Sequence, residues 1–260
     1  KVVPPPRQEG CQDIFSQGDQ KWIENILKDK KEPLFNLAIS GLFPTGSTIK
    51  PLIASAALQE KIISPLKKIY SPGYIEFPNK YNPEITYKFL DQAPPDWYDM
   101  RGAIAVSSNV YFYTIGGGFG KQDGLGPTKI KKYLEFFGWG KETGIDLPGE
   151  VKGLVPSPEW KKTVKKEGWW DGDTYNLSIG QSDLQVTPLQ VAVAYSYIAN
   201  GGTLYKPQIV QKIVDGSASL TTGGSASLTT GGAEASAVTV QVPEVTPREL
   251  KARLDRGDDL

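Results

Sequence analysis

The sequence contains no histidine and only one cysteine, Cys11, among its 260 residues. The lack of histidine excludes a Ser-His-Asp triad, a histidine general base and a histidine-based zinc site. A single cysteine excludes an intramolecular disulfide framework. Acid–base chemistry must therefore use lysine, aspartate, glutamate or tyrosine side chains, and we expect neither a metal site nor a cofactor.

Net charge and long apolar runs are also absent. Lysine plus arginine equals aspartate plus glutamate, 29 each, so no net field would attract nucleic acid, and we expect no nucleic-acid partner. No apolar run approaches the ~20 residues that a membrane-spanning helix needs. No signal peptide is visible either. The sequence as given is that of a soluble chain, which says nothing of a membrane anchor outside it.

Aromatic residues are absent after Tyr205, and this absence marks a break in the chain. An eight-residue sequence then occurs twice in succession, at 216–223 and 224–231. Small polar residues of this kind cannot bury a core, so they predict a linker. We therefore expect an extended segment at 1–11, a main domain at 12–215, a linker at 216–232 and a strand–helix tail at 233–260.

The tail shows weak alternation at 238–242, followed by a capping box formed by Thr246 and Glu249. Residues 243–257 resemble the opening of a rhodanese-like domain, and a generic capped helix is an equal alternative. A fusion whose tail acts as a sulfurtransferase is a further alternative. The lack of any cysteine after Cys11 argues against it.

The central motif of the sequence is Ser-x-x-Lys, formed by Ser47 and Lys50 directly after a Pro-Thr-Gly turn at 44–46. Ile49 and Ile53 recur at helical spacing, which places Ser47 in the first turn of a core helix. Because positions i and i+3 are neighbours on a helix, the Lys50 amine could take the proton of the Ser47 hydroxyl. The tetrapeptide alone also fits a helix start with a solvated lysine.

The remaining pattern is rich in helix, with little strand. Prolines and tyrosines at 63–100 favour irregular loop with short strands, and a last strand is expected at 210–215. Helices are predicted at 20–28, 47–61, 100–115, 128–137 and 187–200.

Two further patterns do not indicate a binding site. The glycine-rich stretch at 116–121 resembles a phosphate loop, but Ile115 stands at the first glycine position and Gln122 replaces the magnesium-binding Ser or Thr. The lysine cluster at 161–166 is interpreted as a solvated loop.

Ser107 and Asn109 form a Ser-x-Asn motif that would complement the Ser-Lys pair, with a serine that relays a proton and an amide that binds substrate. With Ser47 and Lys50, these residues lie in a longer pattern that resembles class B penicillin-binding proteins of the elongation-specific penicillin-binding protein 2 type. The resemblance covers about residues 12–215. The matching strings lie at 33–51, 105–113, 143–150, 153–157, 173–181, 185–190 and 199–202.

The resemblance implies a serine-type DD-transpeptidase that cross-links peptidoglycan stem peptides through an acyl-enzyme. It implies that Ser47 is the acylated nucleophile, Lys50 its proton acceptor and Ser107 a proton shuttle, whereas Asn109 binds the donor peptide. The Ser47 backbone N–H would form half of an oxyanion hole. β-Lactams and the cell-wall elongation machinery are the implied partners, at the extracytoplasmic face of the cytoplasmic membrane.

The family's third motif, Lys-Thr-Gly on a strand beside the active site, does not occur in this sequence. We therefore expect an α+β fold of the transpeptidase/β-lactamase type, mainly its α-rich half with an incomplete central sheet. We interpret the chain as truncated or recombined, with impaired activity. A non-catalytic penicillin-recognising sensor or scaffold of the same superfamily is the alternative function.

Overall fold

The computed structural model describes residues 24–25, 27–30, 32, 34–78 and 84–209, together with the backbone of 212–214 and 239–241. The chain divides into two compact units, residues 1–143 with 149–205 and residues 144–148 with 206–260. The segment predicted at 1–11, the linker at 216–232 and the helix of the tail lie outside the described residues. The predicted domain boundaries therefore stay predictions.

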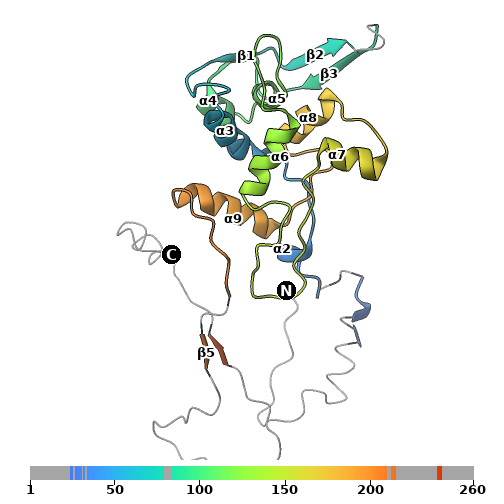
Figure 1. The fold of residues 1–260 in the computed structure, drawn as a ribbon, viewed down its shortest axis with the longest axis vertical. Helices are drawn as coiled ribbons and strands as arrows, with labels where there is room; N and C mark the ends of the chain where they lie inside the picture. Colours follow the sequence, from blue (N-terminus) through green and yellow to red (C-terminus); the bar gives the residue numbers. More distant parts are fainter. Residues whose placement is uncertain are drawn as a thin grey trace, which may run out of the picture. The chain divides into compact units, whose positions relative to one another are not determined.

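The first unit contains short strands between helices (Figure 1). Its helices and turns are α2 (Leu37–Ser40), η1 (Gly46–Ile49), α3 (Lys50–Gln59), α4 (Met100–Ala105), α5 (Asn109–Gly117), α6 (Gly126–Phe136), α7 (Pro158–Trp160), η2 (Lys161–Lys165), α8 (Asp171–Ser178) and α9 (Pro188–Ala199). Its strands are β1 (Ile69–Ser71), β2 (Tyr74–Pro78), β3 (Thr86–Leu90) and β4 (Asp96–Tyr98).

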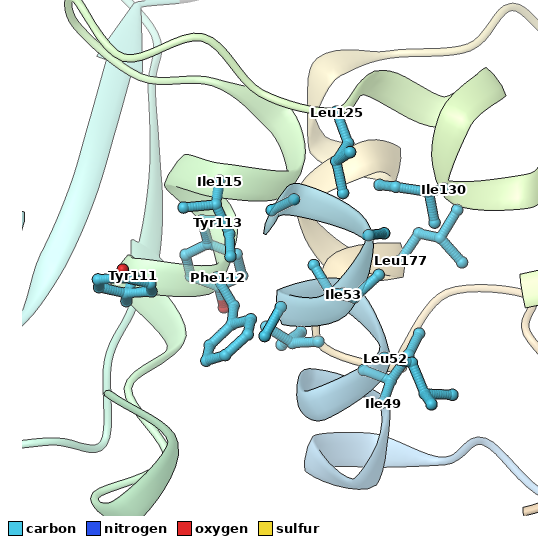
Figure 2. Close-up of a cluster of buried hydrophobic side chains, with 14 of the residues drawn as sticks. Ile49, Leu52, Ile53, Tyr111, Phe112, Tyr113, Ile115, Leu125, Ile130 and Leu177 are labelled. Carbon is cyan, nitrogen blue, oxygen red and sulfur yellow. The ribbon is translucent and has the colours of Figure 1, made fainter. Parts of the chain in front are cut away.

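Helix α5 is the centre of the core, because α3, α6 and α8 all pack against it. Every residue from Val110 to Gly116 is buried, so this helix has no solvent-facing side over that stretch. Helix α3 contributes Leu52 and Ile53 to the same cluster, as Figure 2 shows. A helix that is apolar on all sides must lie inside the domain, so the residues at its N-terminus are held in a fixed place.

The contact between α5 and α8 requires glycine on α5. A Cβ atom added to Gly116 would lie 1.9 Å from Ser178 Oγ, and one added to Gly117 would lie 2.5 Å from the Tyr175 ring. Real Cβ atoms do not approach other atoms so closely. The first two glycines of the stretch at 116–121 therefore serve to pack α5 against α8. This explains a pattern that resembles a phosphate loop without being one.

The strands of the first unit form two antiparallel two-stranded ribbons, β1 with β4 and β2 with β3. This confirms the expectation of irregular loop with short strands at 63–100. The β2–β3 ribbon packs on the helices through aromatic rings, with Phe89 5.3 Å from Tyr175 between centroids. No sheet among the described residues has more than two strands, which agrees with the α-rich half of an α+β fold.

The predicted helices are confirmed at 47–61, where η1 and α3 lie, and at 128–137 and 187–200, where α6 and α9 lie. Helix α9 begins with a capping box in which Thr187 accepts from the Gln190 N–H and Gln190 accepts from the Thr187 N–H. The helix predicted at 100–115 is interrupted. It is two helices, α4 and α5, separated by a turn at 106–108.

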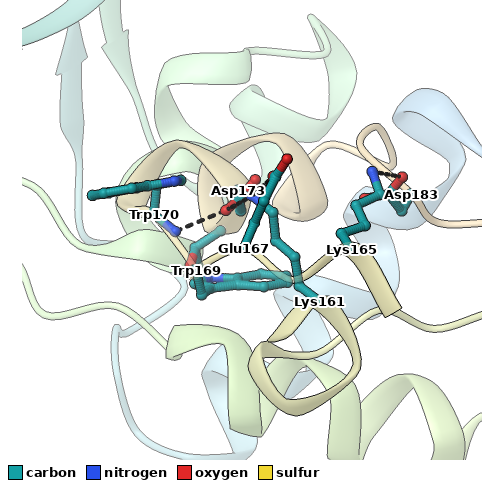
Figure 3. Close-up of polar contacts among 8 residues, drawn as sticks. Lys161, Lys165, Glu167, Trp169, Trp170, Asp173 and Asp183 are labelled. Atoms are coloured by element: carbon teal, nitrogen blue, oxygen red, sulfur yellow. Dashed lines mark hydrogen bonds and ion pairs between the residues drawn. The ribbon is translucent and has the colours of Figure 1, made fainter. Parts of the chain in front are cut away.

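The lysine cluster at 161–166 is solvated at Lys162, Lys165 and Lys166, as the sequence indicates, but Lys161–Lys165 form the helical turn η2 rather than a loop. Lys161 is buried, and its Nζ lies 2.7 Å from Asp173 Oδ2 and 3.7 Å from Glu167 Oε2 (Figure 3). Lys165 forms a second ion pair with Asp183, at 2.6 Å. The segment is ordered by pairing with carboxylates of α8 and the loop after it, and sequence charge alone did not reveal these partners.

The second unit contains β5 (Lys212–Val214) and β6 (Thr239–Gln241), which pair antiparallel with Ile213 opposite Val240. Both strands fall where the sequence predicted them. The pairing joins the tail to the last strand of the predicted main domain, a contact that we did not expect. Within the described part of the chain, no helix has both the length and the apolar character to cross a membrane.

Candidate active site

Ser47 lies in the 3₁₀ turn η1, directly before α3, and its side chain is exposed. Ile49, the last residue of this turn, is fully buried and fixes the turn to the core. On one side, Tyr195 Oη donates to the Thr48 carbonyl oxygen at 2.8 Å. The first N–H groups of a helix have no intrahelical acceptor. Ser47 therefore presents both its hydroxyl and its N–H from the start of a core helix.

Gly180 sets the position of the turn before Ser47. Its carbonyl oxygen accepts from the Gly46 N–H at 2.9 Å. Its φ is +74°, and an added Cβ would lie 2.1 Å from the Gly46 oxygen and 2.3 Å from Thr45 Oγ1. This explains the glycine in the Ile-Gly-Gln sequence at 179–181, because only glycine allows this contact.

Lys50 does not bond directly to Ser47, which corrects the expectation from helical spacing. Among the described residues, its Nζ bonds to Ser107 O at 2.6 Å, Ser107 Oγ at 3.0 Å and Asn109 Oδ1 at 2.7 Å. Ser107 Oγ in turn lies 2.9 Å from Ser47 Oγ. Ser107 therefore stands between Lys50 and Ser47.

The environment of Lys50 favours its neutral form. The side chain is 2 % exposed, and burial lowers the pKa of the amine from 10.5 to about 8, while the Asp91 carboxylate acts in the opposite direction. With a pKa of about 8, about half of the amine is neutral at pH 8, against about 0.3 % for an ordinary lysine. Lys50 can therefore act as a base near neutral pH.

The partners of Lys50 also orient its lone pair. The carbonyl oxygens of Ser107 and the Asn109 amide can only accept, so they hold the two hydrogens of a neutral amine. The third direction then faces Ser107 Oγ, which can donate. In that state a chain of two hydrogen bonds leads from the Ser47 hydroxyl through the Ser107 hydroxyl to Lys50. The geometry suits proton removal from Ser47 by relay.

The Ser-x-Asn motif lies at the start of α5. Ser108 caps this helix by accepting from the Tyr111 N–H at 3.2 Å, and its Oγ donates to Asp91 at 2.6 Å. Asn109 is the first helical residue, and its Nδ2 donates to the Leu90 carbonyl oxygen at 3.3 Å. Both ends of its amide are thus engaged within the protein. Binding of a donor peptide by Asn109 stays a prediction.

Asp91 is the contributor to the site that sequence reasoning missed. It follows β3 and contacts Ser108, as well as the backbone N–H of Asn109 at 2.6 Å. A single aspartate between a strand and two prolines carries no motif. A buried lysine needs a carboxylate nearby, and this requirement could have identified Asp91. The burial of Lys50, however, is evident only in the folded chain.

Comparison with known proteins agrees with this site. A family model described as the penicillin binding protein transpeptidase domain matches residues 15–252. The peptidoglycan D,D-transpeptidase MrdA of Acinetobacter baumannii is 36 % identical over 201 residues, or 76 % of this chain and 28 % of that protein. The chain thus spans less than a third of the length of this curated relative.

Solved structures give the same assignment. The crystal structure of Pseudomonas aeruginosa PBP2 in complex with WCK 5153 is 32 % identical, with a TM-score of 0.64 over 72 % of this chain and 39 % of that one. The complex between PBP2 and MreC from Helicobacter pylori is also 32 % identical, with a TM-score of 0.63 over 73 % of this chain and 33 % of that one. A family match over most of the chain and a serine–lysine site in the same fold lead to one conclusion: the chain belongs to the penicillin-binding protein transpeptidase domain family.

Proposed function

We propose that this chain carries the acylation site of a peptidoglycan DD-transpeptidase, with Ser47 as the nucleophile. The observation that supports this most directly is the hydrogen-bonded series Ser47, Ser107, Lys50, which ends at a buried lysine with a pKa near 8. A serine needs an adjacent base to become a nucleophile, and this series supplies one without histidine.

The proposed reaction begins when Ser47 Oγ attacks the carbonyl carbon of the scissile amide in a stem peptide or a β-lactam. The Ser47 proton passes to Ser107 Oγ, and the Ser107 proton passes to Lys50. The C–N bond then breaks, and the same series returns a proton to the leaving nitrogen through Ser107. The product is an ester on Ser47, which an acceptor amine resolves in the transfer step.

The Ser47 N–H is the proposed first donor of the oxyanion hole. A second donor and an anchor for the substrate carboxylate come, in the family, from the Lys-Thr-Gly strand, and these 260 residues contain no such string. Loss of one oxyanion donor typically costs about 10²–10³ in rate. The proposed activity of this chain by itself is therefore slow acylation.

The proposed setting is the bacterial cell envelope, at the extracytoplasmic face of the cytoplasmic membrane. The relatives named above support it, since one is a peptidoglycan D,D-transpeptidase and another was solved with MreC. We propose stem peptides and β-lactams as ligands and the cell-wall elongation machinery as the partner. The name of the first relative favours an enzyme over the penicillin-recognising sensor.

Labelling with fluorescent penicillin tests this function. We expect slow labelling of this chain, loss of labelling in Ser47→Ala, and an adduct on the peptide that contains Ser47 by mass spectrometry. A version extended through a Lys-Thr-Gly strand should label faster. Labelling that persists in Ser47→Ala would exclude Ser47 as the nucleophile. Transfer of the acyl group to an added amine separates a transpeptidase from a sensor, because a sensor retains the adduct.

A further inference from the structure

We propose that Asp91 is a positioning residue of this site, which holds the Ser107 turn in place and provides the negative charge that balances Lys50. The proposal rests on the proposed function and extends it to a residue that touches neither Ser47 nor, by our assignment, the substrate. Its first support is the number and direction of the contacts that converge on one carboxylate.

Five donors point at the Asp91 carboxylate, from three parts of the chain. Oδ1 accepts from two backbone groups, and Oδ2 accepts from two hydroxyls and one backbone group. The donors are the N–H of Asn109 at 2.6 Å and of Ala93 at 3.1 Å on Oδ1, and Ser108 Oγ at 2.6 Å, Ser71 Oγ at 2.8 Å and the Val110 N–H at 3.1 Å on Oδ2. A half-buried carboxylate saturated in this way is fixed in position.

Two of these donors are the first N–H groups of α5, where a negative charge is favourable. Burial acts to raise the pKa of Asp91, but the hydrogen bonds from Ser108, Asn109, Ala93 and Ser71 together outweigh it and lower the pKa overall. The side chain is therefore ionised at neutral pH. It ties the beginning of α5 to the end of β3.

Ser107, which precedes the residues that Asp91 binds, has a strained backbone. Ser107 has a φ of +57°, a left-handed conformation that costs a non-glycine residue roughly 1 kcal/mol or more. Such a conformation persists only where the surroundings enforce it. Here it turns both the carbonyl oxygen and the hydroxyl of Ser107 toward Lys50 Nζ. The Asp91 contacts to Ser108 and Asn109 hold the two residues that follow, and so maintain this turn.

Asp91 is also the charged group that acts on Lys50. Among the described residues, the groups in contact with the amine are neutral, namely Ser107, Asn109 and the Phe112 ring, whose centroid lies 5.6 Å from Nζ. Nearby Tyr113 stays protonated, because burial raises its pKa to about 12. The Asp91 charge raises the pKa of Lys50 against the effect of burial. Without it, the lysine would release its proton at lower pH.

The Asp91→Asn variant removes the charge and keeps the shape. Asparagine Oδ1 can still accept from Ala93 and Asn109, whereas its Nδ2 faces the Val110 N–H, so the turn loosens. The measurement is the titration of Lys50 by NMR in the chain labelled with ¹³C-lysine, with the signal assigned by Lys50→Met. We expect a Lys50 pKa below that of the unchanged chain. We also expect penicillin labelling to slow by up to about 10²-fold, as for a misplaced catalytic group.

The Asp91→Glu variant keeps the charge and displaces it. We expect a Lys50 pKa close to that of the unchanged chain, together with slower labelling. Asp123→Asn, which removes an exposed carboxylate from the loop after Gly120, should change neither. Thermal melting of each variant verifies that the chain is folded. If Asp91→Asn does not fold, the glutamate variant decides alone.

Three results would overturn the proposal. The first is an unchanged Lys50 pKa in Asp91→Asn, and the second is a pKa that rises toward the ordinary lysine value because water enters the site. The third is labelling at full rate in Asp91→Glu. Failure of the proposed function would look different, since the unchanged chain would then not label at Ser47 at all, while the titration of Lys50 would still report on Asp91.

Discussion

The side-chain oxygens of Ser47 and Ser107 lie 2.9 Å apart, although the two residues are 60 positions apart in the chain. In the relay proposed above, Ser107 is the first acceptor for the Ser47 proton. Lys50, only three residues from Ser47, acts through it. The order of the relay is therefore a consequence of how α5 is placed against α3.

Replacement of Ser107 by alanine should interrupt the relay. General base catalysis contributes about 10²–10⁴ in rate, so we expect penicillin labelling of Ser107→Ala to slow by a factor in that range. Ser107 caps none of the helices that the structure describes, so the melting temperature should change little. The labelling rate is measured by stopping the reaction at successive times and separating the labelled protein by gel electrophoresis.

Ser108→Ala is the matched control for that experiment. Ser108 caps α5 and donates to Asp91 but does not contact Ser47 or Lys50. Loss of an N-cap costs about 1 kcal/mol, so this variant should lower the free energy of unfolding more than Ser107→Ala does. A larger loss of labelling in Ser108→Ala than in Ser107→Ala would contradict the assignment of the relay.

The pH dependence of labelling should report the pKa of Lys50. The neutral amine is the reactive form, so the rate should rise with pH through about 8 and level off above it. For a solvated lysine the rise would continue toward pH 10. Lys50→Arg should label poorly throughout, because a guanidinium does not lose its proton in proteins. A rate that is flat between pH 7 and 9 would show that Lys50 is not the base.

Gly180→Ala should damage the site through the turn that carries Ser47. The added methyl would overlap the Gly46 oxygen at 2.1 Å, and a displacement near 1 Å can cost about 10² in rate. Gly120→Ala is the control, because Gly120 also has positive φ, +61°, but no atom within 4 Å of the added carbon. Both should lose about 1–2 kcal/mol of stability from backbone strain. Equal labelling rates would argue against a role for Gly180 in placing Ser47.

Lys161→Met should destabilise the fold, because it leaves the Asp173 carboxylate without its cation. Removal of one partner from a buried pair costs about 3–5 kcal/mol. We expect the low end of that range, because 19 % of the Asp173 side chain is exposed. Lys162→Met, at an exposed position, should stay within about 0.5 kcal/mol. Denaturant unfolding of both variants compares the two, and equal values would mean that the ion pair contributes nothing.

The sequence by itself determined the class of fold and the family, and it predicted the four site residues Ser47, Lys50, Ser107 and Asn109. It could do so because motifs such as Ser-x-x-Lys, and local signals such as the Thr187 capping box, act over a few residues. Because these signals are local, one prediction made from them was wrong and another was right only in part. Helical spacing predicted a direct contact of Lys50 with Ser47, and a run of lysines at 161–166 predicted a solvated loop.

The tertiary structure decided the contacts between distant segments. It placed Ser107 between Lys50 and Ser47, brought Asp91 to the start of α5, and buried Lys161 beside Asp173. Each of these contacts involves a polar or charged group that is at least partly removed from water, and such a group needs a partner to be stable. Which partner is available depends on how the helices pack, and the packing of helices cannot be read from the spacing of residues in the sequence.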